Sequence, residues 1–432
     1  MEKFDAIVVG AGPAGLSAAI TMADKGLKVI VIERGDYPGA KNVMGGILYS
    51  EPTAQIFPEF WKEAPLERPI TEESYWFLTG DSVTKFGHRN QRFAEEPYNA
   101  FSVFRAHFDK WMGEKLKAKG GLLICETVVE DVIEKDGKVI GVKCGRANGD
   151  IYADVVIVAE GVNSMLTQKA LKMQKMNMKE DYLAVAVKEV IYLDEEKIED
   201  RFALEKGFGA TIEVIGDSTK GMVGTGFIYT NKESISIGTG ALMSQLIKSK
   251  MSPNDLLESF KNNPMVKPLI RGGETKEYAG HMIPEGGYNA MPKLYGNGVL
   301  VAGDAAQMVN GLHREGSNMA MISGKIAGET VIAAASKGNF SEETLSSYQK
   351  KLEDTFIIKD LKKYKKSSEY FDHNPELFAL YPELVSDAMY TFFNVDGTSK
   401  KDVQKKMMKD AFKKRPVMSM AKDVYNFWRV LV

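Results

Sequence analysis

Cysteine is scarce in this chain of 432 residues, which contains only Cys125 and Cys144. Two thiols are too few for a four-cysteine iron–sulfur or zinc site, and they indicate no disulfide framework. An excess of one charge sign is also lacking, because 56 lysines and arginines are balanced by 58 aspartates and glutamates. That balance gives no reason to expect a nucleic-acid partner. The cysteine usage fits a reducing compartment.

Long apolar runs are lacking as well. No uninterrupted run approaches the length of a membrane-spanning helix, so we expect none, while attachment to a membrane surface stays open. The N-terminus enters the strand-like "DAIVVG" without the basic and apolar regions of a signal peptide, so we expect no signal peptide. No repeat or low-complexity segment is apparent. The length predicts two or three packed units with ordinary globular composition.

The N-terminal segment "DAIVVGAGPAGLSAAITMADKGLKVIVIERG" has the pattern of a strand, a glycine turn, a helix and a second strand. Gly10 suits the tight turn, Gly12 allows the backbone to approach a pyrophosphate, and Gly15 allows close packing of helix on strand. Glu33 follows at the end of the second strand, where it would accept hydrogen bonds from a ribose. The spacing therefore predicts a dinucleotide site, to which we also assign Pro13, Ala14 and Arg34.

A second strand-to-helix junction lies far along the chain, in "GNGVLVAGDAA" and the stretch that follows it. Asp304, after Gly303, is costly to bury unless a polar group lies against it. A helix beginning near Gly316, Ser317 and Asn318 would offer further N–H groups to the same ligand. Nicotinamide dinucleotides have no ribityl chain that needs such a partner. The two motifs together predict FAD.

The whole chain resembles the large flavoprotein group that includes aromatic hydroxylases, geranylgeranyl reductases and electron-transfer-flavoprotein:quinone oxidoreductases. The resemblance rests on "VVGAGPAGLSAA", "VFRAHFDKWMGEKLKAKG", "ADVVIVAEGVNS" and "GNGVLVAGDAA". It implies that Arg105 reaches the cofactor and that Asp304 bonds the ribityl hydroxyls. It implies further that the "VIVAEG" strand, with Ala159 and Gly161, lies beneath the adenosine half, and Val129 is assigned to the cofactor site too.

Two further stretches, "GAKNVMGGILYSEPT" and "RGGETKEYAGHMIPEGGYNAMPKLYGNGVL", are similar to the FixC-type branch of the quinone oxidoreductases, as is "GLHREGSNMAM". Met44, Gly45 and Gly46 would form a loop whose two glycines let the backbone lie against a flat ring. The resemblance implies that Gly272 and Gly273 contact the head of the quinone. A bare hinge between a helix and a returning strand explains that glycine pair equally well.

The chain departs from full-length members of this family, which carry an iron–sulfur cluster on four cysteines in a C-terminal ferredoxin-like domain. No cysteine follows Cys144. In the FixC-type arrangement a separate ferredoxin-like (FixX-type) subunit supplies the cluster, together with the alpha and beta subunits of an electron-transfer flavoprotein. The resemblance thus implies an enzyme of a multi-subunit complex that passes electrons to a membrane quinone such as menaquinone. Electron bifurcation, if it occurs, would belong to the flavoprotein partner.

The predicted fold class is α/β: a discontinuous Rossmann-like FAD domain with an inserted antiparallel-sheet quinone domain and a C-terminal helical region. FAD-domain segments are expected at 1–80, 101–170 and 286–338, and substrate-domain segments at 81–100 and 171–285. Residues 339–432 read as helical, and their aromatic and lysine-rich parts suit a partner or a bilayer as well as ordinary core packing. The resemblance implies a cytoplasmic protein attached peripherally to the inner face of the cell membrane. No metal site and no direct NADH site are expected.

Three interpretations stay open at this stage. A geranylgeranyl-lipid reductase or FAD-dependent monooxygenase of the same fold is the main alternative to the quinone oxidoreductase. A non-catalytic scaffold that holds the partner subunits together is the third. His313 is a candidate acid–base group because imidazole titrates near neutral pH, although a salt-bridged, loop-ordering role with Arg314 and Glu315 is the more ordinary reading.

Overall fold

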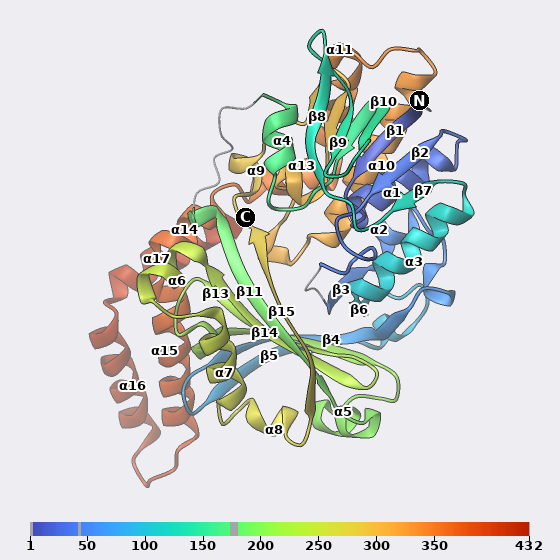
Figure 1. Ribbon diagram of the computed structural model, residues 1–432. Helices are drawn as coiled ribbons and strands as arrows, with labels where there is room; N and C mark the ends of the chain where they lie inside the picture. The colour runs from blue at the N-terminus through green and yellow to red at the C-terminus, as the bar shows by residue number, and fades with distance from the viewer. Residues whose placement is uncertain (1–2, 42–44, 173–179, 432) are drawn as a thin grey trace. The chain divides into compact units, whose positions relative to one another are not determined.

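The computed structural model describes residues 3–41, 45–172 and 180–431 (Figure 1). The chain forms two compact units, each assembled from three segments. The first unit comprises 1–67, 97–183 and 282–365, and the second comprises 68–96, 184–281 and 366–432. The predicted C-terminal region 339–432 is divided between them, because 339–365 belongs to the first unit. Both units are discontinuous in sequence.

The first unit contains a largely parallel sheet with the strand order β16-β17-β10-β1-β2-β7. Strand β1 pairs in parallel with β2 and β10, and β10 pairs in parallel with β17. A hairpin of β8 and β9 continues antiparallel from β10, and β3 pairs antiparallel with β6. The bounds are β1 (Phe4–Val9), β2 (Val29–Ile32), β3 (Gly45–Tyr49), β6 (Ala100–Phe104), β7 (Leu122–Ile124), β8 (Val129–Lys135), β9 (Lys138–Cys144), β10 (Asp150–Val158), β16 (Tyr295–Gly296) and β17 (Val299–Val301).

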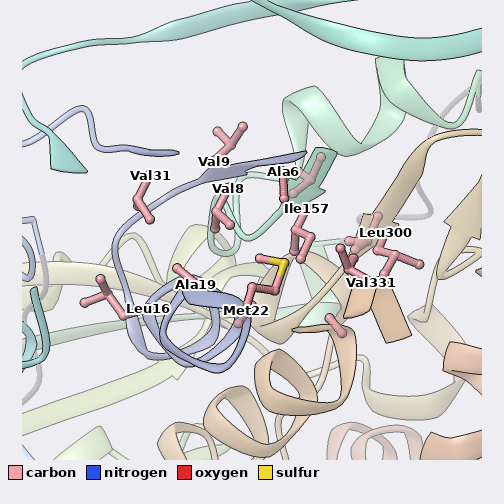
Figure 2. Packing of buried hydrophobic residues seen from close by; sticks show 14 of the residues in the cluster. Ala6, Val8, Val9, Leu16, Ala19, Met22, Val31, Ile157, Leu300 and Val331 are labelled. Atoms are coloured by element: carbon pink, nitrogen blue, oxygen red, sulfur yellow. The ribbon is translucent and has the colours of Figure 1, made fainter. Parts of the chain in front are cut away.

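Two helices of small and apolar residues, α1 (Pro13–Ala23) and α10 (Ser317–Ala335), lie side by side in this unit (Figure 1). Glycine makes their contact close: a methyl group added at Gly324 would lie 2.0 Å from the carbonyl oxygen of Ala14. Figure 2 shows Leu16, Ala19 and Met22 of α1 among the buried side chains that fill the core around β1 and β10. The near-continuous apolar strands suit a sheet covered on both faces.

The remaining helices of the first unit are short apart from α3. Their bounds are α2 (Ser50–Ala54), α3 (Arg105–Ala118), α4 (Met165–Ala170), α9 (Gly287–Ala290), α11 (Glu342–Leu345), α12 (Ser347–Glu353) and α13 (Phe356–Lys363). Helices α12 and α13 belong to the stretch predicted as the start of the C-terminal region. Tyr348, Leu352 and Ile357 are fully buried and join the core of the first unit.

The second unit contains strands in the order β15-β11-β14-β13-β12-β4, with β5 paired to β4. The predicted antiparallel pairing of "GMVGTGFIYT" with "SISIGTGAL" is present as β13 and β14, whereas β12 pairs in parallel with β4. The strand bounds are β4 (Leu66–Leu78), β5 (Val83–Arg89), β11 (Leu183–Tyr192), β12 (Gly209–Gly216), β13 (Gly224–Thr230), β14 (Ser234–Leu242) and β15 (Glu274–Pro284). Four helices accompany them: α5 (Glu195–Phe202), α6 (Met243–Ser249), α7 (Pro253–Asn262) and α8 (Lys267–Ile270).

The C-terminal helices of the second unit are α14 (Ser367–His373), α15 (Glu376–Phe393), α16 (Lys400–Lys414) and α17 (Val417–Leu431). A polar network ties them together at the buried side chain of Asp423. Its carboxylate accepts two hydrogen bonds of 2.9 Å from Arg415 and one of 2.7 Å from the Tyr381 hydroxyl. Among the described residues, no helix has both the length and the apolar character needed to cross a bilayer.

Candidate cofactor and active site

Three neighbouring parallel strands of the first unit end at one edge of the sheet. Backbone hydrogen bonds hold the residues that follow them in line: Ala302 N–H donates to Val158 O at 3.0 Å, and Ala159 N–H donates to Val9 O at 2.9 Å. Helices α1 and α10 begin at this edge, where Ala14, Ala159, Ala302 and Ala320 form a small buried cluster. The carboxyl edge of such a sheet is where open α/β folds bind ligands.

The glycine turn after β1 shows why each glycine stands at its position. Gly10 has φ of +100°, and a methyl group there would lie 2.3 Å from the carbonyl oxygen of Ala159. A methyl group at Gly15 would lie 1.9 Å from the carbonyl oxygen of Gly10. By contrast, no atom lies within 4 Å of a methyl group placed on Gly12. The fold itself requires Gly10 and Gly15, whereas Gly12 faces open space of the kind that a phosphate would use.

The first turns of α1 and α10 have no side-chain caps. Pro13 and Ala14 open α1, while Gly316 precedes Ser317 and Asn318 at the start of α10. The Asn318 side chain is only 3% exposed, and within the described part of the chain its Oδ1 atom has no hydrogen-bond partner. A buried acceptor without a hydrogen-bond partner suits a ligand that carries hydrogen-bond donors, and uncapped helix N-termini suit a ligand with negative charge. FAD has both features.

The Glu33 carboxylate organises the end of β2. Its two oxygens accept hydrogen bonds from the N–H groups of Ala11 at 2.8 Å and Gly35 at 2.7 Å. Each oxygen keeps a further lone pair, so these bonds leave capacity for the predicted ribose hydroxyls. Arg34 is exposed. Thr127 N–H donates to Glu33 O at 2.9 Å, which brings the segment before Val129 alongside this turn.

The Arg105 side chain links α3 to α10. Its guanidinium makes a two-pronged pair with Asp109, with Nε–Oδ1 and Nη2–Oδ2 distances of 2.7 Å, and donates from Nη1 to Ser317 Oγ at 3.1 Å. These bonds use three of the five N–H donors of an arginine, so two remain for a ligand. Arg105 was predicted from the sequence and Asp109 was not, although their four-residue spacing on a helix was a usable signal.

Asp109 is completely buried, and its ion pair with Arg105 offsets the energetic cost of burying the carboxylate. Burial raises the pKa of the Asp109 carboxyl, and the adjacent guanidinium opposes that rise. Gly39 fits tightly against the same turn of α3, because a methyl group on it would lie 2.7 Å from the Arg105 carbonyl oxygen. The ion pair therefore fixes the start of α3 relative to α10.

Asp304 follows β17 in a short 3-10 turn, Gly303–Ala306. Gly303 has φ of +67°, and a methyl group on it would lie 2.8 Å from the Ala14 side chain. Burial raises the pKa of Asp304, and the Arg105 charge opposes the rise. The structure thus places Asp304 in the electrostatic range of Arg105 at the predicted cofactor edge. Gly161, beyond β10, has φ of +80° and no atom within 4 Å of an added methyl group.

The loop that carries His313 is held by its own neighbours. Asn310 and Glu315 exchange two backbone hydrogen bonds of 2.9 and 3.1 Å, and the Asn318 amide donates to Glu315 Oε1 at 3.1 Å. The His313 ring lies against Tyr364 with a centroid separation of 4.9 Å. Burial raises the pKa of Glu315. These contacts fit the loop-ordering interpretation, and the acid–base role of His313 stays a prediction.

An unforeseen carboxyl lies beside this loop. A methyl group added at Gly311 would be 2.1 Å from Glu285 Oε2, so the two residues are in close contact. Burial raises the pKa of Glu285 to about 7. A carboxyl that exchanges its proton near neutral pH suits proton transfer. No sequence pattern separated Glu285 from the other acids of its segment.

Of the glycine loop before β3, the structure describes Gly45 and Gly46, while Met44 lies outside the described residues. Gly45 pairs with Phe104 and Gly46 with Val103 on β6. Phe104 immediately precedes Arg105. The two glycines therefore reach the cofactor edge by strand pairing rather than as part of a free loop.

Gly272 and Gly273 lie in the second unit, between α8 and β15. Gly272 has φ of +75° with no atom within 4 Å of an added methyl group. At Gly273 such a group would lie 2.4 Å from Ile191 Cγ2, and the Gly273 N–H already donates to Ile270 O at 3.0 Å. Gly273 is thus a packing glycine, and Gly272 is the member of the pair with open space.

Comparison with known proteins decides the family. A model described as "ETF-QO/FixC family C-terminal domain" matches residues 367–431, and one described as "FAD dependent oxidoreductase" matches residues 5–163. Protein FixC of Bradyrhizobium diazoefficiens is 46% identical over 432 residues, covering 99% of each chain. Protein FixC of Azotobacter vinelandii is 45% identical and covers 100% of this chain and 99% of its own length. The chain belongs to the FixC family.

Solved structures with the same fold are more distant. A geranylgeranyl bacteriochlorophyll reductase-like protein from Thermoplasma acidophilum superposes with a TM-score of 0.74 at 19% identity, covering 96% of this chain and 98% of the other. A flavin-dependent brominase superposes with a TM-score of 0.65 at 17% identity, covering 96% of this chain and all of the other. At this identity the likeness establishes the fold of an FAD-binding flavoprotein.

The chain is therefore an FAD-dependent oxidoreductase of the FixC family, as the resemblance implied. The residues fit the cofactor: the Gly12 turn and the start of α1 suit the pyrophosphate, Glu33 suits a ribose, and Asp304 suits the ribityl chain. Arg105 and the first turn of α10 offer donors to the remainder. When bound, FAD supplies the electron-accepting ring, and the protein binds and orients it.

Proposed function

We propose that this FixC-family chain receives electrons from an electron-transfer flavoprotein and a separate ferredoxin-like subunit, and passes them through FAD to a membrane quinone. The observation that carries the proposal is the near full-length identity of 40–46% to FixC proteins in a chain with two cysteines. Burial raises the pKa of both thiols, Cys125 and Cys144, which disfavours the thiolates that iron requires. An iron–sulfur cluster would then belong to the partner, which agrees with the FixX-type arrangement.

The experiment is anaerobic. The flavin of the purified chain is photoreduced and mixed with a soluble menaquinone analogue while flavin absorbance is followed. We expect fast, saturable reoxidation by the quinone and no comparable reduction of the flavin by NADH alone. Rapid oxidation of NADH by the chain by itself would contradict the proposal.

A glycine variant tests the route to the quinone. Gly272→Asn puts a side chain into open space at a residue type that tolerates positive φ, so we expect slower reoxidation with little loss of stability. Gly207→Asn is the matched control, because Gly207 has φ of +81° and is equally free of neighbours. Gly273→Val is unsuitable, since it would collide with Ile191 whatever its effect on quinone. Equal rates for Gly272→Asn and Gly207→Asn would remove Gly272 from the quinone route.

The lipid-reductase reading has one supporting observation, the fold shared with the geranylgeranyl reductase-like protein. Product analysis separates it from quinone reduction. A reduced flavin that ignores the quinone analogue but saturates the double bonds of a geranylgeranyl lipid would establish the alternative. A flavin that reacts chiefly with oxygen and hydroxylates a substrate would establish the monooxygenase.

The proposed membrane contact is made by α16 and α17. Helix α16 has seven lysines and two aspartates, and α17 exposes Met418, Val424 and Trp428 at 81%, 66% and 56%. A basic segment next to exposed apolar and indole side chains suits the inner, anionic leaflet of the cell membrane. Sedimentation with anionic vesicles tests this: we expect salt-sensitive binding that Trp428→Ser weakens and Val128→Ser, an exposed control at 54%, leaves intact. Equal binding to zwitterionic vesicles would contradict it.

A further inference from the structure

The sheet of the second unit has one apolar and one polar face. On β11, Glu189 and Ile191 point to the apolar face, where Ile191 joins a core with Ile212, Ile228, Ile237 and Phe260 of α7. The Glu189 carboxylate on this side accepts a hydrogen bond of 2.8 Å from Lys261 of α7. Since side chains alternate along a strand, Lys188 points to the opposite face.

Strand register identifies the neighbours of Lys188. Lys188 stands opposite Gly238 on β14, Gly238 opposite Phe227 on β13, and Phe227 opposite Glu213 on β12. Gly238 leaves room for the aromatic ring, because a methyl group there would lie 2.2 Å from Phe227 Cζ. Phe227 therefore lies across β14 toward Lys188.

The adjacent row adds Tyr229 and Thr211. The Tyr229 ring stacks on Phe227 at a centroid distance of 5.0 Å and an angle of 17°, and its hydroxyl donates to Glu213 Oε1 at 2.9 Å. Thr211 is completely buried, and its Oγ1 has no hydrogen-bond partner among the described residues. We call Lys188, Phe227, Tyr229, Glu213 and Thr211 the polar face.

Burial makes this face unusual. Lys188 is 2% exposed, Glu213 5% and Tyr229 8%, while Phe227 is only half-buried. An ammonium in such surroundings is costly, and burial lowers the pKa of Lys188 to about 8, opposed by the charge of Glu277 on β15. Ionisable groups whose pKa is shifted by burial are typical of functional sites. Here such a group lies next to a flat aromatic surface.

We propose that the polar face binds the headgroup of the electron acceptor, a planar ring with carbonyl oxygens, on the Phe227 ring, with the Lys188 charge at its edge. The inference rests on the proposed function and deepens it. The acceptor takes two electrons from the reduced flavin and two protons from water, so its carbonyl oxygens become hydroxyls. A fixed cation in a dry setting stabilises the negative charge that gathers on these oxygens before the protons arrive.

The charged and titratable groups near Lys188 can be named from the described strands of this sheet. Glu277 lies on β15, and Glu213 with Tyr229 lie on the same face, whereas Glu189 points away. Burial lowers the pKa of Lys188 to about 8. The rate with quinone should therefore fall as pH rises through about 8.

Reoxidation of the photoreduced holoprotein by the menaquinone analogue and by ferricenium, an oxidant without carbonyls, tests the inference. Lys188→Met should slow the quinone reaction about ten- to a hundred-fold, with the ferricenium reaction and the FAD content unchanged. Lys188→Arg should keep most of the rate and move its alkaline fall to higher pH. Phe227→Ala should chiefly raise the KM for quinone. Lys276→Met, at an exposed lysine of β15, is the matched control.

The outcomes separate the two claims. A wild-type protein whose reduced flavin does not react with quinone overturns both the proposed function and this inference. If wild type and Lys188→Met react with quinone equally fast, only the inference falls. If Lys188→Met fails to fold, an identical alkaline fall in wild type and Lys188→Arg overturns the inference, and a shifted one supports it.

Discussion

Replacing Lys188 by methionine should stabilise the protein at neutral pH, because the ammonium is buried and its pKa is lowered from 10.5 to about 8. Each unit of pKa corresponds to about 1.4 kcal/mol, so the burial of the charge costs about 3 kcal/mol at pH 7. Methionine has similar length and no charge, so it removes that cost. The attraction of Glu277 is already included in the pKa of about 8, so we expect a gain of about 3 kcal/mol.

The lowered pKa of Lys188 also predicts how the stability difference between wild type and Lys188→Met changes with pH. Between pH 8 and 10.5 the unfolded chain holds a proton on Lys188 that the folded chain has released, so the stability of the wild type rises with pH in this window. The advantage of Lys188→Met should be complete below pH 8 and shrink steadily toward pH 10. In melting experiments on the holoprotein, the difference in Tm should be roughly 5 °C at pH 7 and close to zero at pH 10.

Two results would refute this reasoning. A lower Tm for Lys188→Met at pH 7 would mean that the ammonium is a net stabilising partner in the folded sheet. A difference in Tm that stays constant from pH 7 to 10 would mean that the pKa of Lys188 is not lowered. Lys276→Met, at an exposed site on β15, should leave the Tm unchanged throughout. The measurement needs no quinone and is independent of the electron-transfer assay.

The cofactor edge provides the remaining predictions. Gly12→Ala should fold normally yet bind FAD at least tenfold more weakly, since its methyl group enters the space where a phosphate would lie; flavin absorbance per chain measures this, and Gly80→Ala, equally free of neighbours, should bind FAD fully. Asp109→Ala should lower the free energy of unfolding by about 3–5 kcal/mol, because it leaves the Arg105 guanidinium buried without its partner. Removing both side chains should cost less than the sum of the single changes in urea unfolding, and strict additivity would show that the pair is not coupled.

Local patterns predicted the first βαβ unit well because each of its signals is local. The glycine spacing, the apolar strands and the acid at the end of β2 all lie within one short segment, and a strand-turn-helix forms from neighbouring residues. The space around each glycine in the structure adds a distinction that the motif does not contain. Gly10 and Gly15 are required by backbone packing against Ala159 and within the turn, and Gly12 alone faces open space.

Contacts between distant segments were harder to foresee. Arg105 and Ser317 were each predicted from a separate motif, whereas their hydrogen bond joins residues 212 positions apart. Gly273 shows that a motif residue can meet a packing demand as well: the resemblance assigned both glycines to the quinone, and packing against Ile191 already requires a glycine at one of them, while the quinone contact stays a prediction. A motif shows which residues occur together, but it does not show whether each residue is needed for packing or for contact with a ligand.

The strand "AVAVKEVIY" shows which feature could not be predicted from the sequence pattern. Alternation places the adjacent charges Lys188 and Glu189 on opposite faces, yet it does not say which face a helix will cover. In the structure, helix α7 packs against the face that carries Glu189. Its Lys261 pairs with the Glu189 carboxylate. Lys188 is left on the opposite face, with Tyr229 and Glu213. A buried cation on that side is a cost to the fold, and the quinone reaction is the function we propose to explain its retention.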